Sequence, residues 1–319
     1  MPQAFNLQTV IAFVWDFDKT LSSGYMQAPL FAEYDIDESQ FWREVNGLVD
    51  YYRQRGLRVS KDTAYLGHLL SYVRAGRFPG LTNLKLRELG AKVGLAPGMP
   101  DFMAGTKEVV ANDQRFAHHG VTVEHYIVST GLRQMIEGNP IHQHVDEIWA
   151  CELLADPPGP DYLNSQAASS SDDEGLLTQV GYVLDNTTKT RAIFEINKGV
   201  NRDPEIDVNA RMADVDRRVP ISNMIYIADG PSDVPVFSVV NQGGGKTLGV
   251  YTLGERSNYE GVRGLQDDGR VNSIAEANYT ENSAAYLWLM SSLRTIATGI
   301  CERRERSIRS ITGPAGHVT

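Results

Sequence analysis

Cysteine is scarce in this sequence, which has only Cys151 and Cys301 among its 319 residues. Two cysteines cannot build the disulfide framework of a small secreted domain, so we expect a reducing, cytoplasmic compartment. Positive charge is also in short supply, because 30 basic residues stand against 40 acidic ones and leave a net charge of −10. That balance argues against a protein that coats nucleic acid.

Long apolar runs are missing as well. No stretch of about 18 apolar residues occurs, so we expect no membrane span. Residues 1–10 lack the basic stretch and following apolar run of a secretory signal peptide. The composition is otherwise ordinary, with 42% hydrophobic and 22% charged residues. A chain of this length can bury a sizeable core, either as two domains or as one large domain with an insertion.

Short apolar runs of strand character alternate with helical stretches such as residues 101–119. Continuous runs of this kind, rich in Val, Ile and aromatic side chains, are typical of strands buried on both faces of a parallel sheet. The runs are residues 10–15, 123–128, 147–151, 224–228 and 247–251. Their alternation with helices predicts a layered α/β fold with right-handed crossovers.

Too many residues separate the first two runs for a single crossover. From residue 22 to residue 96 the sequence is helical and aromatic, with apolar stripes that include Phe41 and Val45 and then Tyr65 and Leu69. We expect a separate helical subdomain inserted after the first strand. Long helices packed on the surface of the same core are the alternative.

The remaining segments complete the domain organisation. Residues 156–175 are rich in Pro and Ser and contain acidic but no basic side chains, which favours a mobile loop. Apolar positions recur at helical spacing within about residues 282–309, which predicts a docking helix. We assign residues 1–21 and 97–255 to the core, 22–96 to the inserted helices and 256–319 to a C-terminal extension.

Two carboxylates follow the first predicted strand, in the segment Asp16-Phe17-Asp18-Lys19-Thr20. Residues i and i+2 of an extended segment share a face, about 6–7 Å apart. At the carboxyl end of a buried strand such a pair is unfavourable unless a cation or a reaction uses it. By itself, the pair could also cap a turn.

Other polar groups stand beside the ends of further predicted strands. They are the hydroxyls and backbone N–H groups of Ser129, Thr130 and Gly131, the ammonium of Lys189 and the carboxylates of Asp229 and Asp233. Ligands of open α/β sheets bind outside the carboxyl ends of the strands. We therefore expect these groups to converge with the two carboxylates of the first strand.

This set of motifs resembles the haloacid dehalogenase-like hydrolase superfamily, in the branch similar to phosphoserine phosphatase. Residues 16–20 match the DxDxT signature, Ser129 the second motif, Lys189 the third and residues 229–233 the fourth. Ala228, where the family often has Gly, and Pro231 depart from the pattern. The resemblance covers residues 8–21 and 97–255, and it implies a Rossmann-like core with an inserted cap.

The resemblance also implies a cytoplasmic, Mg²⁺-dependent enzyme that hydrolyses a small phosphorylated metabolite, with neither nucleic acid nor a membrane as partner. Asp16 would be the nucleophile that carries the phosphoryl group, and Asp18 the general acid and base. The metal would be held by Asp16, the backbone carbonyl of Asp18, Asp229 and Asp233. The phosphoryl group would be bound by Thr20, Ser129, Thr130, Gly131 and Lys189. Related dehalogenases lack the second carboxylate, so phosphate chemistry is favoured over cleavage of a carbon–halogen bond.

Several alternatives stay open. Lys198 competes with Lys189 for the third motif, although Lys189 follows a strand expected at residues 182–184 through a short polar turn, as in the family. A phosphotransferase or phosphomutase could use the same intermediate, and a regulatory ligand-binding module could keep the fold without turnover. The basic residues of the insertion could contact an anionic substrate or form a solvated helix end; they are Arg53, Arg55, Arg58 and Lys61. Substrate, pathway and oligomeric state are left undetermined.

Other patterns favour structural roles. The glycine-rich residues 243–247 lack the first glycine of a P-loop, because Val240 stands there, and a strand rather than a helix is expected next. The histidine pairs at 118–119 and 142–144 have no cysteine or carboxylate at zinc-finger spacing. Cys151, at the end of a predicted buried strand, is expected to pack as a small hydrophobic residue.

Overall fold

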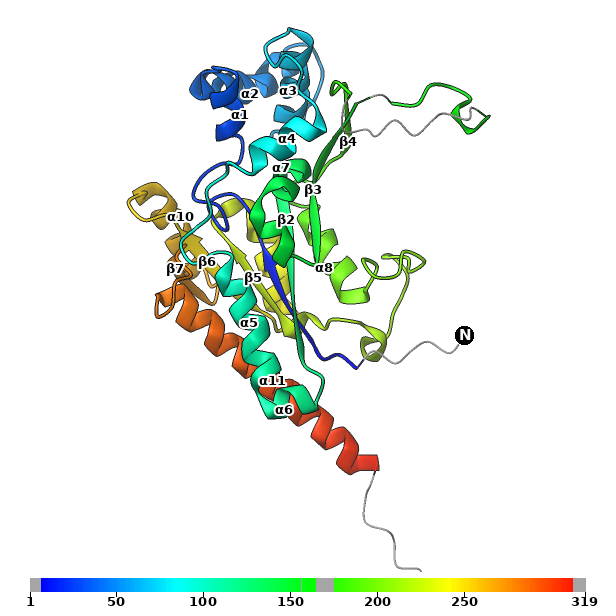
Figure 1. The fold of residues 1–319 in the computed structure, drawn as a ribbon, viewed down its shortest axis with the longest axis vertical. Coiled ribbons are helices and arrows are strands. Elements are labelled where there is room, and N and C mark those ends of the chain that lie inside the picture. The colour runs from blue at the N-terminus through cyan, green and yellow to red at the C-terminus, as the bar shows by residue number, and fades with distance from the viewer. Residues whose placement is uncertain (1–6, 156, 165–174, 312–319) are drawn as a thin grey trace, which may run out of the picture.

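A seven-stranded sheet forms the centre of the computed structural model, which describes residues 7–155, 157–164 and 175–311 (Figure 1). The strand order is β4-β3-β2-β1-β5-β6-β7, and neighbouring strands are parallel except for β3 and β4. The strands are β1 (Val10–Trp15), β2 (Thr122–Leu132), β3 (Glu147–Leu154), β4 (Gln179–Tyr182), β5 (Met224–Ala228), β6 (Lys246–Tyr251) and β7 (Ser273–Glu276). The predicted α/β fold with a Rossmann-like, mostly parallel sheet is confirmed.

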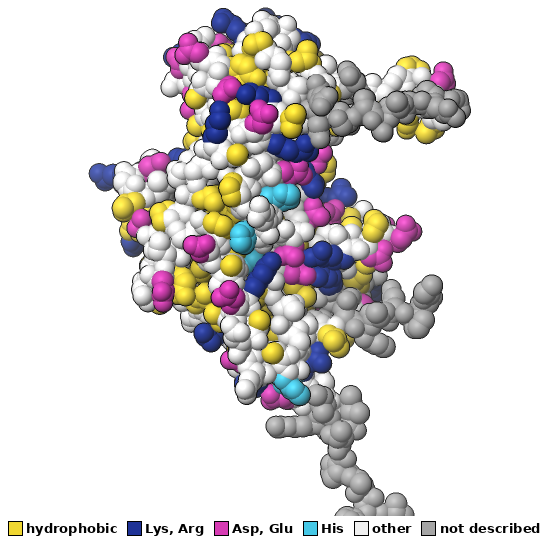
Figure 2. All heavy atoms as spheres, viewed as in Figure 1, with side chains coloured by type: hydrophobic (Ala, Val, Ile, Leu, Met, Phe, Trp, Pro, Cys, Tyr) yellow, Lys and Arg dark blue, Asp and Glu magenta, His cyan; other side chains and the backbone are white. Residues whose placement is uncertain are grey.

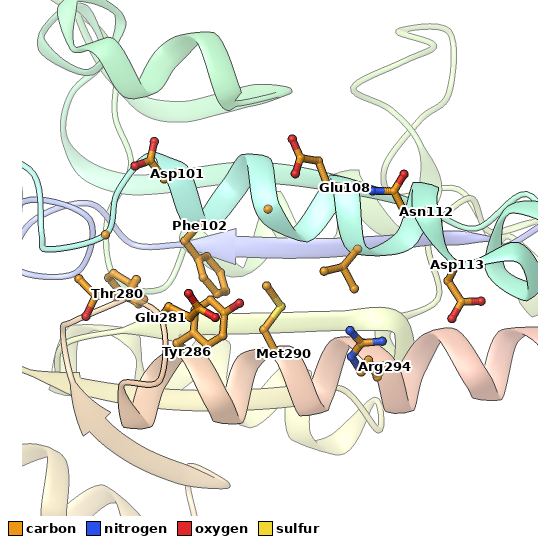
Figure 3. A pocket seen from close by; sticks show the side chains of 14 residues that line it. Asp101, Phe102, Glu108, Asn112, Asp113, Thr280, Glu281, Tyr286, Met290 and Arg294 are labelled. Atoms are coloured by element: carbon orange, nitrogen blue, oxygen red, sulfur yellow. The ribbon is translucent and has the colours of Figure 1, made fainter.

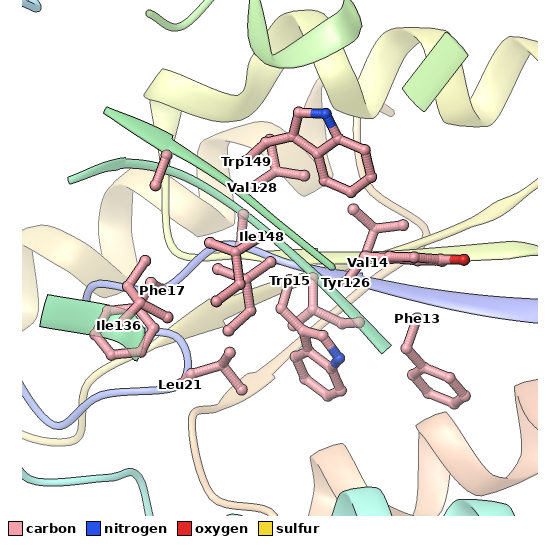
Figure 4. Packing of buried hydrophobic residues seen from close by; sticks show 14 of the residues in the cluster. Phe13, Val14, Trp15, Phe17, Leu21, Tyr126, Val128, Ile136, Ile148 and Trp149 are labelled. Atoms are coloured by element: carbon pink, nitrogen blue, oxygen red, sulfur yellow. The ribbon is translucent and has the colours of Figure 1, made fainter. Parts of the chain in front are cut away.

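Helices cover both faces of the sheet. Phe13 and Trp15 point to the side of α5 (Asp101–Asn112) and α11 (Ala284–Ile311) (Figure 4). Trp149 lies on the opposite side, towards α8 (Lys189–Lys198) and α9 (Val234–Gln242). The other core helices are α6 (Gln114–His118), α7 (Arg133–Gly138) and α10 (Arg256–Asp267). β1 is buried on both faces, which explains its continuous run of apolar residues.

The bounds of β1 and β5 agree with the strands predicted from the sequence, and β2 and β3 run further than predicted. The strand expected at residues 182–184 lies instead at 179–182, as an antiparallel edge strand. The helix expected over residues 101–119 is interrupted at Asp113, because its carboxylate caps α6 by accepting the N–H groups of Arg115 and Phe116.

The C-terminal segment contributes more to the core than predicted. β7 pairs with β6 in the same parallel sheet, so the core extends beyond residue 255. The docking helix expected at about 282–309 is observed as α11, which packs along α5 and α6. Of the segment expected to be a mobile loop, residues 156 and 165–174 lie outside the described part of the chain.

Four helices occupy the insertion between β1 and β2: α1 (Ala28–Glu33), α2 (Glu38–Arg53), α3 (Ala64–Arg74) and α4 (Asn83–Gly90). Figure 1 shows α1, α2 and α3 beyond the carboxyl end of β1. They pack on one another through aromatic rings; the centroids of Phe31 and Phe41 are 4.9 Å apart and those of Phe41 and Tyr72 are 5.2 Å apart. The inserted helices therefore share an apolar cluster above the sheet edge where the motif residues stand.

Charged side chains of both signs are interspersed on the face seen in Figure 2. Lys107 lies 3.4 Å from Asp146, for example, and Arg202 lies 3.4 Å from Glu124. Among the described helices, none has the length and hydropathy needed to cross a bilayer.

α4 and α7 approach so closely that their backbones touch through two glycines. An ideal Cβ on Gly90 would lie 2.0 Å from the carbonyl oxygen of Met135, and one on Gly138 would lie 1.9 Å from that of Arg87. Real side-chain carbons cannot come this near to a carbonyl oxygen. The contact joins the last inserted helix rigidly to the core.

Gly138→Ala should lower the free energy of unfolding by about 1–3 kcal/mol or more, because the added methyl group forces α4 away from α7. Urea denaturation followed by circular dichroism measures the loss. Gly67→Ala is the matched control, since Gly67 is an exposed residue of α3 with no atom within 4 Å of the new carbon. That substitution should raise stability by about 0.5–1 kcal/mol. Equal effects of the two substitutions would contradict the close packing.

Candidate active site

The carboxyl ends of β1, β2 and β5 lie side by side in the middle of the sheet. Trp15 pairs with Ile127 of β2 on one side and with Ile227 of β5 on the other. The N–H of Asp16 donates to the carbonyl of Ile227 at 2.9 Å. This register puts Asp16 level with the beginning of both neighbouring motifs, as expected for ligand-binding groups of an open sheet.

Lys189 joins two of the predicted carboxylates. Its Nζ lies 2.8 Å from Asp16 Oδ1 and 2.6 Å from Asp233 Oδ1. All three side chains are buried, with exposed fractions of 1%, 8% and 0% for Lys189, Asp16 and Asp233. Burial alone would lower the pKa of Lys189, but the two carboxylates outweigh it and raise that pKa, which keeps the ammonium charged.

Asp16, Asp229 and Asp233 form a compact acidic triad. One carboxylate oxygen from each lies within 4.8 Å of the others, and this is the only such group that the described residues offer for holding a metal ion. Asp233 is oriented by the hydroxyls of Tyr226, at 2.5 Å, and Ser232, at 2.7 Å. Asn258 fixes the backbone at Asp229 by donating from Nδ2 to its carbonyl at 3.0 Å.

One ammonium does not balance the negative charge of this site. Burial raises the pKa of Asp16 to about 6, against the opposing effect of Lys189 and with a further contribution from Asp233. Burial, followed by the charges of Asp16 and Asp233, raises the pKa of Asp229 well above its ordinary value. Excess carboxylate oxygens at close range fit a hard divalent cation such as Mg²⁺, which prefers oxygen ligands.

Asp18 stands next to the triad on the segment that leads into the inserted helices. Its Oδ1 accepts the backbone N–H of Met26 at 2.8 Å. Burial, with the charge of Asp16 as the second cause, raises the pKa of Asp18 to about 7. A carboxyl group with such a pKa can both give and take a proton near neutral pH.

Among the predicted phosphoryl-binding residues, Thr130 is half-buried and the others are buried: Thr20, Ser129, Gly131 and Lys189. Ser129 Oγ accepts the N–H of Gly131 at 3.0 Å, and the carbonyl of Thr130 accepts the hydroxyl of Tyr65 at 2.7 Å. The hydroxyl of Thr20 is buried and finds no hydrogen-bond partner among the described residues. A buried, unpaired hydroxyl is unfavourable, and a ligand oxygen would satisfy it.

Lys198 takes a different place. Its Nζ donates to the carbonyls of Val208 and Ala210, both at 2.5 Å, at the opposite end of α8 from Lys189. The geometry therefore favours Lys189 as the lysine of the third motif. In the basic cluster of the insertion, Arg53 pairs with Asp50 and the Arg55 guanidinium lies 3.5 Å above the ring of Tyr51, with both arginines exposed.

The remaining sequence patterns lie in structural surroundings. Lys246 of the glycine-rich segment begins β6, and the segment connects α9 to that strand. His142 and His144 lie on a short 3-10 helix, Pro140–His144, and His119 lies 3.3 Å from Glu305. Cys151 is buried in the core, where its Sγ accepts the N–H of Leu184 at 3.2 Å.

Sequence reasoning missed the residues that support the site from other elements. Tyr279 donates from its hydroxyl to the carbonyl of Thr20 at 2.9 Å and from its N–H to the carbonyl of Pro97 at 2.7 Å. It thus ties together the two chain segments that link the core to the insertion. Tyr65 and Asn258 were equally unforeseen as supports, because each joins the site through a contact distant in sequence. Tyr226 lies only seven residues before Asp233, and it was missed because its place in an apolar run marked it only as a core residue.

A cavity of about 810 Å³ lies between α5 and α11, away from the motifs (Figure 3). Phe102, Tyr286 and Met290 form its apolar part, and Asp101 and Glu108 lie at its edge. None of the motif residues lines it, so this cavity is separate from the candidate active site.

We compared the chain with known proteins in sequence and in fold. No family model matches the sequence. A Borreliella burgdorferi protein described as uncharacterized is 38% identical over 290 residues, covering 90% of this chain and 97% of that protein. A HAD family hydrolase from Salmonella enterica serovar Typhi superposes with a TM-score of 0.50 and 11% identity, covering 87% of this chain and 70% of that chain. A probable phosphoserine phosphatase from Vibrio cholerae gives a TM-score of 0.49 and 13% identity, with 93% and 69% covered.

The chain belongs to one family with the Borreliella burgdorferi protein. It shares its fold with the HAD family hydrolase from Salmonella enterica serovar Typhi.

Lys189→Met should lower the free energy of unfolding in metal-free buffer by about 3–5 kcal/mol, because it leaves two buried carboxylates without their counter-ion. Urea denaturation in the presence of a chelator measures the loss. Lys198→Met is the matched control and should lose only about 0.5–1.5 kcal/mol, because Val208 is half-buried and Ala210 exposed, so water can replace the lost hydrogen bonds. A smaller loss for the Lys189 variant than for the control would contradict the arrangement described here.

Proposed function

We propose that the protein is a Mg²⁺-dependent phosphatase that hydrolyses a small phosphomonoester through an aspartyl-phosphate on Asp16. The observation that carries this proposal is the buried contact of Lys189 with both Asp16 and Asp233, within a triad completed by Asp229. The fold that the chain shares with a HAD family hydrolase supports the same proposal.

The acidic triad and the backbone carbonyl of Asp18 would hold Mg²⁺. When bound, the ion supplies positive charge that offsets the repulsion between a phosphate dianion and the carboxylates. Lys189 and the buried hydroxyls of Ser129 and Thr20 bind phosphoryl oxygens and stabilise the charge that redistributes over them. The side chain of Lys189 also keeps Asp16 in a single orientation for attack.

The chemistry divides into two steps on this chain's own groups. A carboxylate oxygen of Asp16 attacks phosphorus, and the bond to the leaving-group oxygen breaks as Asp18 donates a proton to it. Asp18 then takes a proton from water, whose oxygen attacks phosphorus and breaks the bond to Asp16. Phosphate is released, and both aspartates return to their starting states. The raised pKa of Asp18, about 7, suits both proton transfers near neutral pH.

A phosphotransferase or phosphomutase would pass the phosphoryl group from Asp16 to an alcohol instead of water. Stoichiometric free phosphate from a monoester supports hydrolysis, whereas a new ester that appears only with an added alcohol supports transfer. Free, buried Cys151 and Cys301 are compatible with action in the reducing cytoplasm.

Asp16→Asn should reduce phosphate release by at least about 10³-fold while leaving the fold intact, because the amide keeps the shape of the carboxylate but cannot attack phosphorus. Phosphate release from a panel of phosphorylated metabolites, with and without Mg²⁺, measures the effect, and circular dichroism checks the fold. Asp267→Asn is the control, since this exposed residue pairs only with Arg263 on α10, and it should keep full activity. Near-normal turnover in the Asp16 variant would refute the assignment of the nucleophile.

Mg²⁺ should raise the melting temperature of the protein, because binding to the folded state alone stabilises it. Asp229→Asn should abolish most of this shift, since it removes one of the three converging carboxylates. Differential scanning calorimetry over a magnesium titration gives the result without any substrate. An unchanged shift in the variant would place the ion elsewhere.

A further inference from the structure

The segment between β1 and α1, residues 16–27, carries a methionine into the candidate active site. Met26 has an exposed fraction of 0%. Its backbone N–H donates to Asp18 Oδ1 at 2.8 Å, and its Sδ accepts the N–H of Leu132 at 3.1 Å. Met26 thus connects the proposed general acid directly to the segment that follows the second motif.

Gly131 makes room for this side chain. An ideal Cβ at Gly131 would lie 2.2 Å from Met26 Cε, 2.5 Å from its Sδ and 3.2 Å from Ser129 Oγ. The end of the Met26 side chain therefore fills the space over Gly131, where an added Cβ would also come close to the hydroxyl of Ser129. A side chain at residue 131 would compete for the same volume.

Two further contacts hold this arrangement. The hydroxyl of Tyr65, from α3 of the insertion, donates to the carbonyl of Thr130 at 2.7 Å, and its side chain is buried. At the beginning of the segment that carries Met26, residues 16–27, Lys19 Nζ lies 2.7 Å from Glu255 Oε2. The segment that carries Met26 is thus anchored near both its ends.

We propose that Met26 is a specificity-determining residue, whose side chain limits the size of the leaving group that the phosphatase accepts. This inference rests on the proposed function. The leaving-group oxygen has to reach the carboxyl group of Asp18 to receive its proton, and that carboxyl group accepts the backbone N–H of Met26. The side chain of the same residue lies over Gly131, beside the second motif. We therefore expect a bulky alcohol joined to that oxygen to meet the Met26 side chain.

The thioether suits such a position because methionine is unbranched and its end adapts to the shape beside it. Its contact with the Leu132 N–H is a weak one, since sulfur is a poor acceptor. Substrates small enough to leave the contact in place are favoured, and bulkier ones have to displace the side chain. Truncating Met26 removes that penalty.

The experiment compares phenyl phosphate with 2-naphthyl phosphate, whose leaving groups have similar acidity and differ in size. The measured quantity is the ratio of kcat/KM for the larger to the smaller ester, with Mg²⁺ present. Met26→Ala should raise this ratio by about tenfold or more, the effect of freeing a few methylene groups of space in an apolar site. Met26→Leu, which nearly conserves the volume, should leave the ratio within about threefold of the parent value.

Met103→Ala is the matched control, because Met103 is just as buried but lies on α5. It should lose stability without changing the ratio. Met26→Val is used in the same way if the alanine variant does not fold. Binding of phenylphosphonate and 2-naphthylphosphonate, measured by calorimetry, should show the same change in the ratio of dissociation constants without turnover.

The outcomes separate this inference from the proposed function. If the parent protein releases phosphate while Met26→Ala and Met26→Val leave both ratios unchanged, Met26 does not determine specificity and the phosphatase assignment stands. If the parent protein releases no phosphate from any monoester, the proposed function fails and the inference fails with it. A rise in the ratio for Met103→Ala equal to that for Met26→Ala also overturns the role of Met26.

Discussion

The candidate active site depends on one buried ammonium held among carboxylates. Lys189 contacts Asp16 and Asp233 directly, and Asp229 completes the acidic group within 4.8 Å. In an environment of low polarity a lone carboxylate is strongly unfavourable, and a single cation cannot neutralise several. Burial, together with the charge of a neighbouring carboxylate, raises the pKa values of both Asp16 and Asp18. A site that is short of positive charge is suited to recruit a divalent cation and an anionic substrate together.

The surrounding fold keeps this unfavourable arrangement in place. Three strand ends present the motifs at one edge of the sheet, and side chains from β5 and from more distant elements hold them there. Tyr226 orients Asp233, Asn258 fixes the backbone at Asp229, and Tyr279 ties Thr20 to the second connection between core and insertion. These contacts add rigidity where the chemistry needs preorganised groups. The close contact of α4 with α7 joins the inserted helices to the core that carries the motifs.

Much of the fold followed from local patterns. β1 and β5 are buried on both faces, so an uninterrupted apolar run marks each of them clearly. β4 and β7 are short edge strands with mixed polarity, and neither has a periodic pattern strong enough to locate it. Asp113 broke the helix expected over residues 101–119 because a capping side chain competes with helix continuation, an effect that apolar spacing alone does not reveal.

The sequence by itself determined which reactive side chains stand at the strand ends, because residue type and the end of an apolar run are both local properties. The tertiary structure determined which of these side chains meet and which residues from other elements support them. Lys198 and Lys189 lie on the same helix, and only the packing of α8 directs one towards Asp16 and the other towards backbone carbonyls. Met26 and Tyr65 meet the second motif across 106 and 65 residues of chain. Contacts of that separation leave no periodic trace in a single sequence, since they are created by the packing of elements that form independently.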